Sequence, residues 1–227
     1  MKRRQVVALI VFGILAGCSG GGNSPGNVVT RDTEPSLSKD ALILAAGIAP
    51  GPWVELSTAK QIDADLKAIR TSIPALTAIS ARGEADPKQV IVTLKTDTAW
   101  RSAWNTGTLA TGVSAVDSAL SSYKAIQVHE LSDTSAIYVV SFDQWMNTQK
   151  LGEAIKPVDA SITNTGVDSY VGDGNDIEVL EVGKKYRFQK GWGDCASGCT
   201  SKHYWTVTGA GSEWSVEESG APLEGAG

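Results

Sequence analysis

Apolar and polar positions along the chain follow a helical period first and an alternating one later. Near residue 60, apolar residues recur every three or four positions, which places them on one face of a helix. We therefore predict an amphipathic helix over 55–73, ended by Pro74, and a second short apolar segment at 75–79. Both belong to a helical N-terminal segment, residues 40–88. The positions that carry the pattern are Ile62, Leu66, Ile69 and Ile73.

The middle of the chain switches between strand-like and helix-like segments. The order strand, helix, strand, strand, helix, strand is that of the split βαβ arrangement. We therefore predict a ferredoxin-like region over residues 89–171. Its strands are expected at 89–95, 125–131, 136–142 and 160–165, and its helices at 98–104, 112–123 and 147–155.

The C-terminal part has only strand-like segments, separated by short turns. Consecutive short strands joined in this way form an antiparallel β-meander, expected over 172–219 and followed by a disordered tail at 220–227. The chain as a whole is therefore predicted to be α+β, with a helical N-terminal layer, a ferredoxin-like centre and this meander. The strand-like segments are 177–182, 185–190, 203–208 and 213–217.

The N-terminus has the pattern of an export signal. Three basic residues precede an eleven-residue apolar run, Val6–Ala16, which is too short for a transmembrane helix and suits a signal peptide. The run leads into a Leu-Ala-Gly-Cys sequence that ends at Cys18 and resembles the lipobox of bacterial lipoproteins. This resemblance implies removal of residues 1–17 and acylation of Cys18. The alternative is an ordinary secretory signal with a chance cysteine.

The residue after Cys18 bears on which membrane the lipid enters. Ser19 stands where an Asp would resemble an inner-membrane retention signal. The implied localisation is the outer membrane of a Gram-negative envelope. Residues 18–39 are rich in Gly, Ser, Asn and Pro and cannot bury a core. We therefore expect them to form a flexible tether that spans roughly 25 Å.

Composition narrows the classes of partner. Apolar residues make up 42% of the 227 residues, which is enough for a packed core. Acidic residues outnumber basic ones by 25 to 20, and loss of the three basic signal residues leaves 25 against 17. An acidic chain without a basic stripe is unsuited to nucleic acid. A lipid, rather than charge, must hold such a chain to an anionic membrane.

Two segments resemble known families. Residues 89–171 are similar to the propeptide-type inhibitor domains of subtilisin-like proteases, through the strands QVIVTLK and AIYVVSF and the later segment LGEAIKPV. This resemblance implies that the region binds a protein partner, a protease in that family. Residues 187–206 resemble a family of uncharacterised bacterial lipoproteins that ends in Trp-Gly-Asp-Cys-x-x-Gly-Cys-x-x-x-x-Tyr-Trp. The second resemblance implies an envelope lipoprotein and no particular activity.

Two cysteines near the C-terminus, Cys195 and Cys199, enclose three residues. Because an exported protein folds in an oxidising compartment, we expect them to form a disulfide in a small loop. The alternative is a zinc site in which His203 and Asp194 join the two thiolates, although structural zinc sites usually pair their cysteines at other spacings. We predict no metal and no other cofactor.

The sequence offers few residues that could act in catalysis. Two histidines, His129 and His203, are available as general bases. In the mature chain Gly-x-Ser-x-Gly occurs at 22–26 and Ser-x-x-Lys at 36–39, 57–60 and 121–124. The first lies in the predicted tether, and none follows a predicted strand as the nucleophile of a hydrolase elbow does. We therefore expect no catalytic residues, and the alternative is a hydrolase whose catalytic groups these patterns do not reveal.

Aromatic residues gather near the C-terminus. Trp192, Tyr204 and Trp205 are candidates for an exposed platform that stacks on a glycan or a peptide, and packing in the core is the alternative. The favoured function is that of a lipid-anchored envelope protein with a non-enzymatic binding or surface-structural role. Its partner is expected to be a protein or a glycan.

Overall fold

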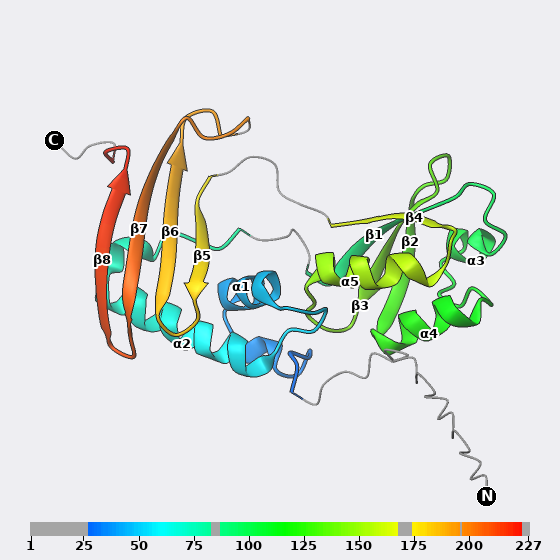
Figure 1. Cartoon of the computed structure of the whole chain (residues 1–227), viewed down its shortest axis with the longest axis horizontal. Helices are drawn as coiled ribbons and strands as arrows, with labels where there is room; N and C mark the ends of the chain where they lie inside the picture. Colours follow the sequence, from blue (N-terminus) through cyan, green and yellow to red (C-terminus); the bar gives the residue numbers. More distant parts are fainter. Residues whose placement is uncertain (1–26, 83–86, 168–173, 196, 224–227) are drawn as a thin grey trace, which may run out of the picture.

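The computed structural model describes residues 27–82, 87–167, 174–195 and 197–223. It contains helices and two four-stranded antiparallel sheets, so the predicted α+β class is confirmed (Figure 1). The predicted lipidation residue, Cys18, lies outside the described residues. Within the described residues, no helix has both the length and the apolar character needed to cross a membrane.

The first sheet has the strand order predicted for a ferredoxin-like region. Its strands lie in the order β2-β3-β1-β4, and every neighbouring pair is antiparallel. Strand β3 therefore lies between β1 and β2, and β1 lies between β3 and β4, which is the split βαβ arrangement. The strands are β1 (Gln89–Leu94), β2 (Ala125–Ser132), β3 (Ile137–Phe142) and β4 (Ile162–Gly166).

Helices cover one face of this sheet, and the module has a core of its own. Along β1, Val90 and Val92 point into the core while Ile91 lies on the other face, as strand alternation requires. Trp100 and Trp104 pack against each other in this core, since their ring centroids are 5.0 Å apart and both rings are buried. The helices are α3 (Arg101–Asn105), α4 (Ser114–Ser122), α5 (Thr148–Ile155) and the 3-10 helix η3 (Lys156–Val158).

The second sheet is the predicted meander, with strands in the order β5-β6-β7-β8. It extends further than predicted, because the backbone N–H of Ala221 donates to the carbonyl of Lys202 at 2.8 Å and Leu223 packs against the core. The expectation of a disordered tail from residue 220 was therefore wrong for residues 220–223. The strands are β5 (Asp176–Glu181), β6 (Lys185–Trp192), β7 (Ser201–Ala210) and β8 (Glu213–Gly220).

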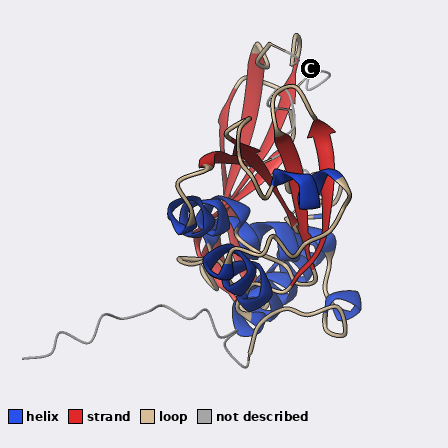
Figure 2. Ribbon diagram, turned by 90° about the vertical axis from the view of Figure 1, so that its right-hand side faces the viewer, coloured by secondary structure: helices blue, strands red, loops and turns tan. Residues whose placement is uncertain are grey.

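The N-terminal helices pack on the C-terminal sheet rather than on the ferredoxin-like module. Side chains of α1 (Lys39–Ile48) and α2 (Leu56–Ser72) share one hydrophobic core with β5, β6 and β7. Figure 1 shows both helices beside this sheet, and Figure 2 shows most helices gathered below the strands. The ferredoxin-like module is therefore inserted between the two halves of a second α+β unit. Two further 3-10 helices are η1 (Glu34–Ser36) and η2 (Pro74–Leu76).

The predicted tether was too long. Val28 forms an antiparallel bridge with Glu55, and Val29 is fully buried and donates its backbone N–H to the carbonyl of Val54 at 2.9 Å. Residues 27–39 therefore belong to the folded part. Val28 and Val29 pair with residues 54–55, and the glycine-rich, polar composition of the segment gave no indication of this pairing.

Candidate functional site

The edge strand β2 displays two large apolar side chains to solvent. Its pairing with β3 shifts by one residue between Ala125 and Gln127 and again between Glu130 and Ser132. Each shift leaves one unpaired residue, Ile126 and Leu131, and bulges of this kind redirect a side chain. At 47% and 54% exposure, these are the two most exposed large apolar residues of the described chain.

A groove of about 520 Å³ runs beside this strand. One wall is β2, and the other is the end of α3 with the turn that follows, where Gly107 lies close to the backbone of Val128. The positive φ of Gly107, 77°, suits a residue without a Cβ. The residues lining the groove are Trp104, Asn105, Thr106, Gly107, Gln127, Val128, His129, Glu130, Leu131 and Asp133.

Arg101 fixes the α3 wall of the groove in place. Its guanidinium donates to the hydroxyl of Tyr138 at 2.8 Å and forms an ion pair with Asp133 in the β2–β3 turn. The Tyr138 hydroxyl in turn donates to the side-chain oxygen of Asn105. Because charge-assisted hydrogen bonds are the stronger ones, the groove is a preformed feature of the module.

The uncovered face of the sheet continues from β2. His129 pairs with Val139, and Val139 pairs with Ile91, so the three side chains form one row across the sheet. Val139 and Ile91 are half-buried, yet neither belongs to a hydrophobic core among the described residues. We call Ile126, Gln127, His129, Leu131 and the adjoining groove the β2 edge surface.

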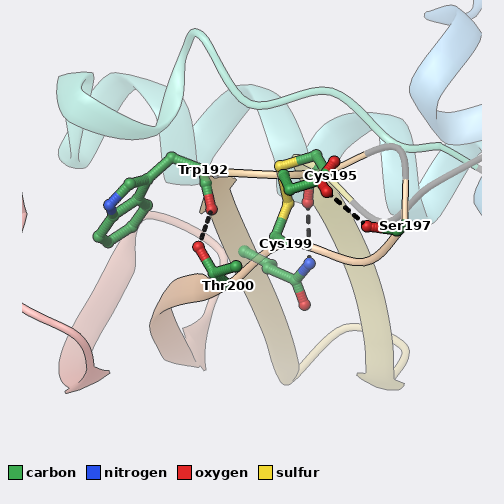
Figure 3. Close-up of a disulfide and its surroundings, with 8 residues drawn as sticks. Trp192, Cys195, Ser197, Cys199 and Thr200 are labelled. Atoms are coloured by element: carbon green, nitrogen blue, oxygen red, sulfur yellow. Dashed lines mark hydrogen bonds between the residues drawn. A yellow bond between two sulfur atoms is a disulfide. The ribbon is translucent and has the colours of Figure 1, made fainter.

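The predicted disulfide between Cys195 and Cys199 is confirmed, and it closes the loop between β6 and β7. The loop is held by a hydrogen bond from the Ser197 hydroxyl to Asp194, and by one from Thr200 to the carbonyl of Trp192 (Figure 3). Because the two sulfurs are bonded to each other, neither is a thiolate ligand, and the zinc alternative is wrong.

His203 is held by hydrogen bonds within the C-terminal sheet. Its Nδ1 lies 2.8 Å from the carbonyl oxygen of Ala221, and its Nε2 lies 3.1 Å from the carboxylate of Glu218. The ring is buried beside Trp205, with centroids 4.4 Å apart. Both partners lie at the C-terminal end of the sheet, so the ring links β8 and residue 221 to β7.

The predicted aromatic platform does not form. Trp205 is only 5% exposed and packs in the core, while its neighbour Tyr204 points to the opposite face, where Arg187 lies 5.6 Å from its ring. Trp192 pairs with Ser201 at the far end of the hairpin, and its ring points away from the disulfide (Figure 3). The three residues therefore share no common surface.

The chain matches no protein-family model, and no curated protein or solved structure is significantly similar to it. The two family resemblances therefore stay predictions.

The β2 edge surface was not predicted from the sequence, because regular alternation would bury Ile126 beside Val128. The one available signal was Leu131, an apolar residue on the polar face of the predicted strand.

Proposed function

We propose that this protein is a lipid-anchored bacterial envelope protein that binds a protein partner through the β2 edge surface and carries out no catalysis. The observation that carries the proposal is the display of Ile126 and Leu131 by two bulges beside a preformed groove. Apolar side chains exposed beside a groove are typical of interaction sites, whereas singly exposed ones are ordinary on a protein surface.

The composition of the surface favours a protein over a glycan or a small ligand. Its apolar residues are aliphatic, and the rim is polar, with His129, Glu130 and Asp133 lining the groove. An apolar centre with a polar rim is typical of protein interfaces, whereas glycans stack on exposed aromatic rings. The bulges interrupt the strand edge, so the partner docks against side chains and does not add a strand.

The anchor is proposed from the sequence. The Leu-Ala-Gly-Cys sequence at the end of a short apolar run supports acylation of Cys18, and Ser19 supports outer-membrane localisation. The similarity of residues 89–171 to protease propeptides supports a protein partner and makes a protease the first class to test.

The anchor is tested by metabolic labelling with a fatty-acid probe. The wild-type protein should carry the label and sediment with membranes, and Cys18→Ser should do neither. Equal labelling of both proteins would overturn the anchor.

Docking is tested on the solubilised envelope by the size of the native complex that contains the protein. Leu131→Asp should release the protein from that complex. Val216→Asp is the matched control, because Val216 is another exposed apolar residue on an edge strand, β8, and it should leave the complex intact. A wild-type protein that migrates as a free monomer would contradict the proposal, and so would identical behaviour of the two variants.

A further inference from the structure

The chain is fixed to the fold much closer to Cys18 than its composition suggests. The backbone N–H of Leu56 donates to the carbonyl of Asn27 at 2.9 Å, and Val28 bridges Glu55. Further along, the Arg31 guanidinium pairs with Asp143 at 2.5 Å. Residues 19–26 therefore separate Cys18 from Asn27, which is hydrogen-bonded to the fold.

A segment of this length allows little distance between lipid and protein. Fully extended, the steps from Cys18 to Asn27 span about 30 Å. A random coil of the same length spans roughly 16 Å on average. The surface around Asn27 must therefore lie near the bilayer that receives the acyl chains at Cys18.

That surface carries side chains suited to a membrane interface. Trp53 is two residues from Glu55, the bridge partner of Val28, and its ring lies 5.6 Å from that of Tyr123. Both rings are half-buried, so each keeps an exposed part. Tryptophan and tyrosine rings settle at the level of lipid headgroups, because they are apolar with a polar tip.

Two basic side chains lie beside the aromatic pair. Lys124 follows Tyr123, is exposed, and accepts a backbone hydrogen bond from Asp143 at 3.0 Å. Asp143 is also the partner of Arg31, so Lys124 and Arg31 are close together. Arg31, Lys124 and Asp143 together carry a net charge of +1, so in a chain with an excess of acidic residues this surface is locally basic and attracts anionic headgroups.

We propose that the surface formed by Arg31, Trp53, Tyr123 and Lys124, the Asn27 face, lies against the bilayer that holds the acyl chains. This inference rests on the proposed anchor at Cys18. In Figure 1 the first described residues and the start of β2 lie at the lower edge of the molecule, and the β2–β3 turn lies at the upper edge. Strand β2 therefore rises from the membrane, and Leu131 at its far end faces a partner above the lipid surface.

The experiment places a fluorescent probe at either end of this axis. Ser121→Cys lies in α4, two residues before Tyr123, and Thr134→Cys lies in the β2–β3 turn; both positions are exposed. Each labelled full-length protein is purified from membranes and reconstituted into vesicles of phosphatidylethanolamine and phosphatidylglycerol. Nitroxide on the lipid headgroups should quench the probe at 121 roughly threefold more than the probe at 134.

Two further measurements separate the reasons for failure. Intact mass reports acylation at Cys18 independently of the probe, so a missing acyl mass would overturn the anchor and this inference together. Equal quenching at both positions in acylated protein would overturn the inference alone. Inserting about 20 Gly and Ser residues after Gly22 lengthens the average span to roughly 30 Å and should reduce the quenching at 121. Lys124→Glu should reduce it as well, and unchanged quenching in both variants would contradict the contact.

Discussion

The buried carboxylate of Asp65 provides a direct test of the link between the N-terminal helices and the C-terminal sheet. Asp65 lies on α2, is 2% exposed, and accepts three hydrogen bonds. The donors are the Tyr186 hydroxyl at 2.5 Å, the Gly183 backbone N–H at 3.1 Å and the Gln61 amide at 2.8 Å. Two of these donors come from β6 and the β5–β6 turn, far away in sequence.

Asp65→Ala removes the acceptor and leaves the Tyr186 hydroxyl and the Gly183 N–H without partners. A buried donor without an acceptor costs about 1–3 kcal/mol, so we expect the free energy of unfolding to fall by about 4 kcal/mol. Tyr186→Phe removes one hydrogen bond and leaves Asp65 with two donors, which should cost about 1.5 kcal/mol. The double variant should be more stable than the sum of the two losses predicts, because the variants share one interaction.

The assay is urea unfolding of residues 27–227 with the disulfide intact, followed by circular dichroism. A loss below about 1 kcal/mol in Asp65→Ala, or additive effects in the double variant, would refute the reasoning. Alkaline pH gives an independent check, because burial and then Asp65 raise the pKa of Tyr186. The neutral Tyr186 hydroxyl contributes fully to the free energy of unfolding below its pKa in the unfolded chain, about 10, and this contribution is lost as pH rises through its pKa in the folded protein. Tyr186→Phe should lack this alkaline loss.

Three other predictions address separate parts of the fold. The backbone N–H of residue 111, with further donors from residues 111–112, lowers the pKa of Asp117. This carboxylate therefore stabilises the fold above about pH 3.9, and the stabilisation is lost as pH falls through its folded pKa. In urea unfolding between pH 2 and 6, the stability of Asp117→Asn should depend less on pH than that of the wild type, and an equal dependence would contradict this role. Gly209→Ala should lower the free energy of unfolding by roughly 2–3 kcal/mol, because the new Cβ would lie 2.0 Å from the carbonyl oxygen of Glu213. Gly47→Ala is the control, because its Cβ would have nothing within 4 Å, and this variant should melt at a slightly higher temperature than the wild type. Reducing the disulfide should cost about 2 kcal/mol without unfolding the protein, since it closes a short loop, and complete unfolding on reduction would show a larger role.

Local patterns along the chain predicted most of the elements. Helix α2 follows the spacing of its apolar residues, and α5 begins after Asn147, whose side chain caps the helix. Helix α1 lies in the segment predicted to be helical, but it was not predicted as a separate helix, because its apolar residues are continuous and show no helical period. A continuous run is compatible with a buried helix once a second layer covers it, and the sequence does not say what that layer is.

The parts that could not be predicted depend on partners distant in the chain. Val29 is buried because Val54 offers a backbone partner, and α2 packs on strands that follow it by more than 100 residues. The bulges at Ile126 and Leu131 depend on the register with β3, which alternation alone leaves regular. The disulfide was predictable, because the two cysteines are close in sequence and exported proteins, the class that the N-terminal sequence predicts, fold in an oxidising compartment.

The proposed binding role is tested most directly by photo-crosslinking in living cells. A benzophenone amino acid at Leu131 probes the β2 edge surface, and the same residue at Val216 probes an exposed edge strand of the other sheet. The account predicts a discrete crosslinked product of protein mass from position 131 and none from position 216. Absence of a product at 131, or the same products from both positions, would contradict it.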